Sequence, residues 1–193
     1  MEHHEYILPY KELEYIQSTG TQYINSNVLC KSSLRCQAKF STEIHSGGCF
    51  IGNSGTGESD TFRFFTAGNG TWYLDFGSGD GRNRISGGNA NTNTIYNVEF
   101  GNRYIKNLDT GSNIISSSTV ESFTKSYNVN ICNSGENLKI YYCKIYDDNE
   151  LIRDFIPVKQ IETDIVCLYD KITEQFYTNS GSGTFIAGPE VDE

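Results

Sequence analysis

Proline, methionine and basic residues are scarce in this sequence, and it contains no long apolar run. Of its 193 residues only 3 are Pro and 1 is Met, while 15 Lys and Arg face 24 Asp and Glu, giving a formal net charge of -9. A surface this acidic repels polyanions, so we expect no nucleic-acid binding and no docking on anionic membranes. No stretch approaches the roughly 20 apolar residues of a transmembrane helix, so we expect no membrane insertion.

The beginning of the sequence lacks the features of a secretory signal. Residues 1–9 carry acidic side chains and no apolar core of signal-peptide length. We therefore expect the protein either to stay where it is made or to leave inside a particle.

The sequence also lacks cysteine patterns that hold zinc. No Cys-x-x-Cys occurs and no His follows at zinc-finger spacing, and without an export signal the even number of cysteines does not predict disulfides. Cys36 alternates with polar residues, as a small buried apolar residue in a strand does. We predict reduced thiols at Cys30, Cys36, Cys49, Cys132, Cys143 and Cys167.

Aromatic residues and glycine are abundant instead, with 13 Tyr, 11 Phe and 19 Gly. This composition favours strands and turns over helices. Residues 34–40, 72–76, 96–100 and 127–131 alternate between apolar and polar side chains, and turn signals recur every 8–12 residues or so. The pattern predicts an all-β fold, a two-sheet antiparallel β-sandwich. The expected core contains Cys36, Ala38, Phe40, Trp72, Leu74, Val98, Phe100, Val129 and Ile131.

Several local features refine this prediction. Residues 67–70 read as a hairpin turn, and residues 138–146, apolar on both faces, read as a central strand. The strand that begins at Leu151 is expected to end at Pro157, because proline cannot donate a ladder hydrogen bond. Residues 77–93, rich in Gly, Asn and Ser, read as an exposed loop.

Two stretches near the two ends of the sequence carry a family resemblance. The first is Leu13–Ile24 (LEYIQSTGTQYI), and the second combines Leu168–Asp170 (LYD) with Phe176–Phe185 (FYTNSGSGTF). Together with residues 139–157, which look like a late hairpin, they resemble laminin-G-like (concanavalin A-like) jelly-roll domains of phage, prophage and gut-bacterial surface proteins. The resemblance spans about residues 10–189. It implies two stacked antiparallel sheets and a domain that binds glycans or proteins, with glycosidases a minority.

The resemblance divides the chain into an N-terminal arm (1–9), a jelly-roll domain (10–189) and a C-terminal tail (190–193). Tyr6, Ile7 and Leu8 are consecutive apolar residues, and Pro9 restricts Leu8 to an extended conformation. An extended apolar segment can dock on the sheet edge or groove of a neighbour. We therefore predict that Tyr6, Ile7 and Leu8 bind a partner chain.

Catalytic patterns are missing. A glycosidase on this type of sheet needs paired carboxylates on one strand face, as in Glu-x-Asp-x-x-Glu, and the sequence has none. Glu99 stands alone in its strand, and residues 147–150 hold their acidic side chains in a turn. His45 precedes a glycine pair, and no Gly-x-Ser-x-Gly elbow occurs. We expect no enzyme activity, and glycoside hydrolysis is the least favoured alternative.

Glycan binding has better candidates. Arg63, Tyr73 and Asp75 alternate with core residues, so they are expected to share one exposed sheet face if their strands pair. The alternative is an ordinary solvated outer face. The residues expected at the rim of the site are Asn53, Asn69, Arg82 and Asn89.

Calcium is the one cofactor that the sequence leaves open. The candidate ligands Asp60, Asp75 and Asp80 lie in loops or at a sheet rim, and oxygen ligands suit Ca²⁺. The simpler interpretation, that these carboxylates are solvated, is favoured.

These observations lead to one functional expectation with two alternatives. We expect a non-catalytic structural or adhesive component exposed on the surface of a phage virion, such as a capsid decoration, fibre or tail protein. Its partners would be other virion proteins or copies of itself, with cell-surface glycan as a further ligand. The alternatives are a glycan-binding module on a bacterial cell surface and, less favoured, a glycoside hydrolase.

Overall fold

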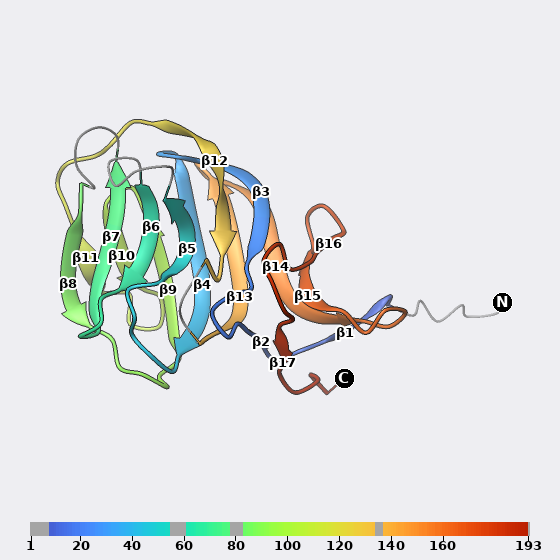
Figure 1. Cartoon of the computed structure of the whole chain (residues 1–193). Helices are drawn as coiled ribbons and strands as arrows, with labels where there is room; N and C mark the ends of the chain where they lie inside the picture. The colour runs from blue at the N-terminus through green and yellow to red at the C-terminus, as the bar shows by residue number, and fades with distance from the viewer. Residues whose placement is uncertain (1–7, 55–60, 78–82, 134–136, 193) are drawn as a thin grey trace.

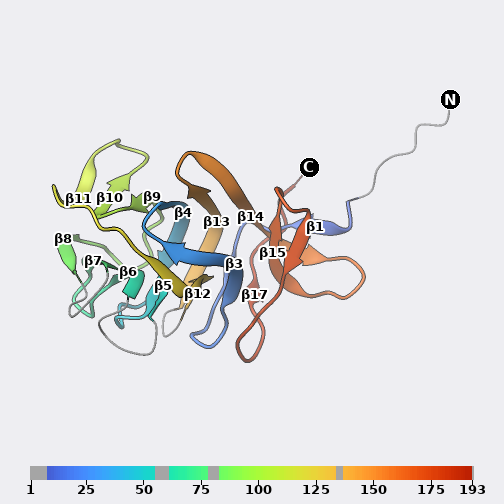
Figure 2. The ribbon, with the colours of Figure 1, turned by 90° about the horizontal axis from the view of Figure 1, so that it is seen from above.

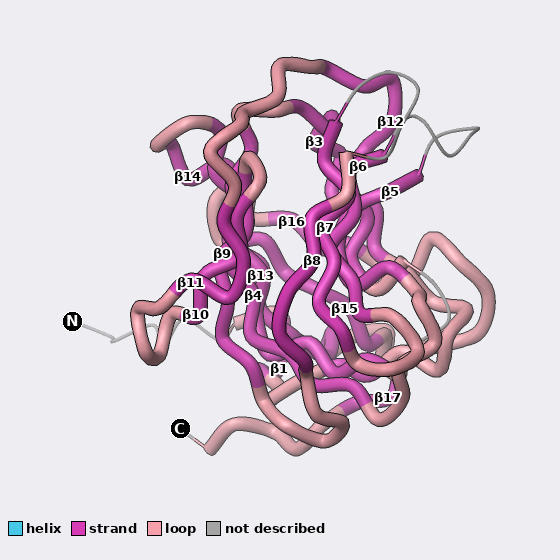
Figure 3. Tube along the Cα trace, turned by 90° about the vertical axis from the view of Figure 1, so that its left-hand side faces the viewer, coloured by secondary structure: helices cyan, strands magenta, loops and turns pink. Residues whose placement is uncertain are grey.

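The computed structural model describes residues 8–54, 61–77, 83–133 and 137–192. Within these ranges all regular structure is β-strand, and every strand pairing is antiparallel. The strands form two sheets that stack face to face (Figures 1 and 3). The prediction of an all-β, two-sheet antiparallel sandwich is therefore confirmed. In the described ranges, no helix of membrane-spanning length and hydropathy is found.

The smaller sheet has six strands. Their order across the sheet is β3 (Ile24–Lys31), β12 (Thr124–Ile131), β5 (Cys49–Ser54), β6 (Thr61–Thr66), β7 (Thr71–Gly77) and β8 (Ile85–Asn89). The turn at residues 67–70 joins β6 to β7, as predicted, with the Gly70 N–H donating to the Ala67 carbonyl at 2.8 Å.

The larger sheet has eleven strands. Its main path runs β11 (Asn113–Ser116), β10 (Tyr104–Asn107), β9 (Tyr96–Gly101), β4 (Leu34–Thr42), β13 (Leu138–Asp147), β14 (Glu150–Gln160), β15 (Val166–Asp170) and β16 (Gln175–Tyr177). Three short strands complete it: β1 (Tyr10–Glu12), β2 (Ile16–Gln17) and β17 (Ile186–Ala187). The predicted central strand is confirmed, because β13 lies between β4 and β14.

The main core lies between the two sheets and is rich in aromatic rings. Trp72 stacks on Phe64 with 5.5 Å between ring centroids, and Phe40 contacts both rings edge-on. All nine residues predicted for the core are at most 1% exposed, which follows from their period-two alternation. The six cysteines are likewise buried and free, as small apolar residues in a core are.

The larger sheet reaches beyond the smaller one (Figures 1 and 2). We call this part the lateral extension and define it as residues 8–17 and 155–191. It forms because β14 diverges from β13 after Phe155, and the N-terminal segment fills the gap between them: β1 pairs with the end of β14 and β2 pairs with the start of β13.

Two sequence predictions are wrong: the end of one strand and the position of one loop. Strand β14 continues through Pro157 to Gln160. The Pro157 carbonyl faces the N-terminal segment, where it accepts the Leu13 N–H at 2.9 Å. The nitrogen of Pro157 faces the same edge, because N and C=O of one strand residue point in the same direction. Pairing with β15 on the other edge therefore needs no N–H from Pro157. The predicted loop at residues 77–93 contains strand β8, which pairs with β7 although Gly87 and Gly88 weaken its strand signal.

The two stretches that carry the family resemblance contact each other. The Ser180 and Ser182 N–H groups donate to the carbonyls of Tyr23 and Thr21, at 2.8 and 3.2 Å. Gly181 makes this approach possible, because a Cβ there would lie 2.0 Å from the Thr21 carbonyl oxygen. The two stretches therefore have a structural role in closing the sandwich.

Candidate functional site

The surface has three features that could serve as a site: a polar row across the smaller sheet, a pit at one end of the sandwich, and an apolar region on the lateral extension. The polar row follows from strand register. Asn25, Asn130, Gly52, Arg63 and Asp75 are successive partners across β3, β12, β5, β6 and β7, on the face opposite the core. Gly52 adopts φ of 125°, and a Cβ there would lie 2.0 Å from the Phe62 carbonyl oxygen, so only glycine fits.

Asp75 is the residue of this row that binds two arginine side chains. Its carboxylate is fully buried and accepts hydrogen bonds from Arg63 Nη2 at 2.7 Å and from Arg84 Nε and Nη2 at 2.6 and 2.9 Å. Arg84 lies just before β8, next to Asp75. Two charge-assisted contacts compensate for the burial of one carboxylate, and they join β6, β7 and β8 on the outer face.

Aromatic rings extend the same cluster. Phe65 and Tyr73 are directly opposite in β6 and β7 and stack with centroids 5.4 Å apart. The Arg63 guanidinium lies 4.6 Å from the Phe65 centroid, and that of Arg84 lies 4.8 Å from the Tyr73 centroid. Such cation–π contacts hold the arginine side chains flat against the sheet.

The predicted glycan-binding residues are thus brought together only in part. The shared face of Arg63, Tyr73 and Asp75 is present. Asn69 and Asn89 lie at the far end of β7, where they bond to Thr71. Asn53 is the register partner of Phe62, on the core side, and Arg82 lies outside the described residues. The calcium candidates Asp60 and Asp80 also lie outside them.

One of the three calcium candidates, Asp75, has no free carboxylate oxygen. Both carboxylate oxygens of Asp75 are occupied by guanidinium N–H groups, so they are not available to a cation. Among the described residues, no three His, Cys, Asp or Glu side chains gather in a group that could hold a metal ion.

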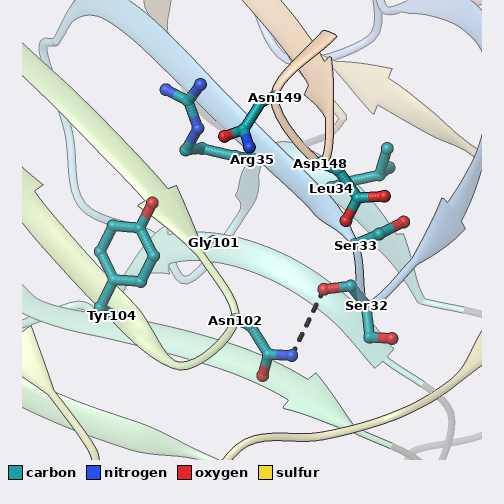
Figure 4. A pocket seen from close by; sticks show the side chains of 9 residues that line it. All are labelled: Ser32, Ser33, Leu34, Arg35, Gly101, Asn102, Tyr104, Asp148 and Asn149. Carbon is teal, nitrogen blue, oxygen red and sulfur yellow. Dashed lines mark hydrogen bonds between the residues drawn. The ribbon is translucent and has the colours of Figure 1, made fainter.

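The second feature is a pit of about 310 Å³ where three turns meet at one end of the sandwich (Figure 4). The turns are β3–β4, β9–β10 and β13–β14. Asn102 fixes two of them together: its Nδ2 donates to the Ser32 carbonyl at 3.3 Å, the dashed line in Figure 4, and to the Glu121 carbonyl at 2.8 Å. The lining residues are Ser32, Ser33, Leu34, Arg35, Gly101, Asn102, Tyr104, Asp148 and Asn149.

One wall of the pit is held by Glu99. Its carboxylate accepts hydrogen bonds from Arg35 at 2.5 Å, Gln37 at 2.7 Å and the Tyr104 hydroxyl at 2.8 Å. Burial alone would raise the pKa of Glu99, but these hydrogen bonds outweigh it, so its pKa lies below the usual value. Burial and the neighbouring Glu99 raise the pKa of Tyr104. Arg35 also lies 3.9 Å from the Tyr146 ring centroid, which fixes its position.

The opposite wall is the β13–β14 turn. Asp147 is bound by the Lys31 ammonium and by the Ser33 hydroxyl, at 2.7 Å for the latter, and these contacts lower its pKa. Asp148 has φ of 53°, a left-handed conformation that Asp tolerates. The exposed side chains of Asp148 and Asn149 face the pit (Figure 4). Hydrogen bonds and ion pairs therefore hold both walls, while a carboxylate and an amide remain accessible at the rim.

The third feature is the apolar character of the lateral extension. Tyr10, Tyr169 and Phe176 form a ring cluster on its outer face, with centroids 4.6 to 6.1 Å apart. They cover a small second core of Ile156, Val158 and Cys167. Ten large apolar side chains are exposed in the described part of the chain, and six of them lie in the extension: Leu8, Ile161, Ile165, Ile172, Ile186 and Val191.

A groove of about 610 Å³ opens between the tip of the β14–β15 hairpin and the loop before β17. Its apolar surface comes from Ile165, Val166 and Phe185. Thr163, Thr178 and Thr184 also line it. Sequence periodicity could not reveal this groove, because its two sides lie more than ten residues apart in non-repeating turns.

Only one residue of the predicted partner-binding segment is described. Tyr6 and Ile7 lie outside the described residues, while Leu8 is 49% exposed. Pro9 contacts the hairpin tip, where its carbonyl accepts the Ile161 N–H at 3.1 Å. At the other end of the chain, the Val191 N–H donates to the Glu12 carbonyl at 3.0 Å, so regular pairing continues past Pro189.

We compared this chain with known protein families, curated proteins and solved structures. No family model, no curated protein and no solved structure matches this chain. The resemblance to laminin-G-like domains therefore stays a prediction from the sequence.

Proposed function

We propose that this chain is a non-catalytic structural or adhesive component exposed on a phage particle, and that it joins other virion proteins or further copies of itself through the lateral extension. The observation that carries the proposal is the concentration of six of the ten exposed large apolar side chains in this one region. Scattered apolar residues are ordinary on a surface, whereas clustered ones indicate a protein-interaction site.

The chemistry of the carboxylates supports a non-catalytic role. A glycosidase needs two accessible carboxyls facing one another across a sugar. Here Asp75 is held by two arginines and Glu99 by three donors. Asp170 accepts the N–H groups of Asp154 and Ile172 at 2.7 and 3.1 Å, which shapes the β15–β16 turn. Each of these acids has a structural role.

A glycan-binding role is the second candidate, and the pit favours it. Sugars are recognised by carboxylates and amides that bond to vicinal hydroxyls, and side chains already held by hydrogen bonds lose less entropy on binding. Asp148 and Asn149 supply these groups on a turn that Asp147 holds in place. This role is compatible with the first, since the pit lies outside the lateral extension.

Replacement of extension residues tests the first proposal. Ile161→Asp and Ile172→Asp are expected to reduce incorporation of the chain into its particle, because each places a charge in an apolar contact. Val120→Asp is the matched control, since Val120 is 76% exposed and lies elsewhere. The measurement is the amount of tagged chain that co-purifies with particles. Normal incorporation of both extension variants would contradict the proposal.

The glycan-binding role is tested on a glycan array with the full chain and with Asp148→Ala and Asn149→Ala. Both variants are expected to lose binding at least about tenfold, equivalent to about 1.4 kcal/mol. Glu174→Ala, at an exposed turn outside the pit, is the control. Binding that both pit variants retain would place the glycan elsewhere, and loss on calcium chelation would show that an ion is required.

A further inference from the structure

We infer that the groove between residues 163–166 and 178–185 receives the apolar segment Tyr6–Leu8 of a second copy of this chain, so that two copies exchange their N-terminal segments reciprocally. This inference rests on the proposed assembly through the lateral extension and names its partner and its contact.

The groove suits an extended apolar peptide. Its volume of about 610 Å³ lies in the usual range for ligand sites, about 300–1,000 Å³. Ile165 is 43% exposed at its edge, whereas Phe185 at 4% forms its base. Three extended residues span about 10 Å. Thr178 and Thr184 also line the groove, and threonine hydroxyls can bond to the peptide groups of an extended segment, which has no partners of its own.

The N-terminal segment has the matching chemistry. Tyr6, Ile7 and Leu8 are the only three consecutive large apolar residues in the first 23 positions of the sequence. Pro9 holds Leu8 extended, and Leu8 is half exposed where the described chain begins. Seven further residues precede Leu8.

The geometry favours a second copy over the same chain. Lys159 of β14 pairs with Lys11 on one edge and with Val166 on the other, so β14 separates β1 from the groove side. Going backwards along the chain, β1 runs towards the hairpin tip and passes Ile161 at Pro9. To enter its own groove, the segment would have to reverse around this tip.

Reciprocal exchange follows from the position of both elements at one tip. The segment leaves beside Ile161, and the groove begins at Thr163, two residues further along the same hairpin. Two copies that meet tip to tip can therefore each place Tyr6–Leu8 in the groove of the other, in a closed two-fold arrangement. The contact would cover Leu8, Ile161 and Ile165 together.

Sedimentation equilibrium of the full chain tests the inference. We expect a monomer–dimer equilibrium that Ile165→Asp weakens at least about tenfold. Thr184→Arg, which obstructs the groove from its exposed opposite side, is expected to have the same effect should Ile165→Asp fold poorly. Val120→Asp is the control and should leave the equilibrium unchanged. A chain that is monomeric at all concentrations, or a dimer insensitive to both groove variants, would overturn the inference.

Photo-crosslinking identifies the occupant. A benzophenone amino acid at position 7 is introduced into the full chain, and ¹⁵N-labelled and unlabelled copies are mixed before irradiation. Crosslinks from position 7 to the peptides containing Ile165 or Phe185 are expected between labelled and unlabelled copies. Crosslinks within one copy only would overturn the exchange. If the chain is monomeric yet enters its particle only with residues 1–7 present, the inference fails while the proposed function stands.

Discussion

Replacement of Asp75 by asparagine tests whether the outer face of the smaller sheet is held together by one buried carboxylate. Asp75→Asn keeps the size of the side chain but removes its charge and places an amide N–H₂ group against two guanidinium groups. Removing one partner of a buried ion pair costs about 3–5 kcal/mol. Because the Arg63 and Arg84 side chains are 19% and 33% exposed, water can solvate part of the freed charge, so we expect about 2–4 kcal/mol.

The expected loss is measurable in a chain of this length. For about 150–250 residues, 1 kcal/mol corresponds to about 2–4 °C, so the melting temperature should fall by about 5–15 °C. Trp72, the single tryptophan, is 1% exposed and reports unfolding in urea by fluorescence. Asp164→Asn is the control, because the Asp164 carboxylate is 78% exposed in its pair with Lys159, and should leave the midpoint unchanged. Equal stability of Asp75→Asn and the parent would refute the reasoning.

Three further predictions concern the polar row, the cysteines of the core and the pit. Gly52→Ala should destabilise the protein in the same urea assay by more than about 1 kcal/mol, since its Cβ would clash with the Phe62 carbonyl oxygen; an unchanged midpoint would contradict the strand geometry. Burial raises the pKa of Cys49 to about 12, and all six cysteines are buried. All six thiols should therefore react with a disulfide reagent at pH 8 only after unfolding, and fast reaction of the native protein would contradict this prediction. The pKa of Glu99 is lowered, so its stabilising contribution is present above the ordinary value of 4.5 and is lost as the pH falls through the folded-state pKa. Urea midpoints from pH 6 to 3 should therefore fall more steeply for the parent than for Glu99→Gln, and parallel curves would show that Gln37 and its neighbours do not hold the carboxylate.

The sequence predicts which face a strand residue occupies, because the face depends only on a period of two. Arg63, Tyr73 and Asp75 share a face for this reason, and the short turn at residues 67–70 sets the register that pairs Arg63 with Asp75. The same logic could have found Phe65, two residues after Arg63. It was left out because the glycan-binding candidates were chosen among polar side chains and Tyr73.

Other parts of the site have no local signal. Arg84 precedes a strand with two glycines, so its region looks like a loop until the pairing with β7 is seen. The pit needs three turns that lie far apart in the sequence, and Asp148 in one of them looks like any solvated turn residue. The lateral extension depends on the divergence of β14 from β13. Pro157 led to the wrong prediction of a strand end, because its nitrogen faces the N-terminal segment and not β15.

The central claim is that the lateral extension is the assembly side of the molecule, and hydroxyl-radical footprinting tests it most directly. The reactivity of each side chain is compared between the isolated chain and the chain in its assembly. We predict strong protection of Ile161, Ile165 and Ile172, with Tyr73 on the opposite sheet unchanged. Protection of Tyr73 together with unchanged reactivity of the three isoleucines would contradict the account.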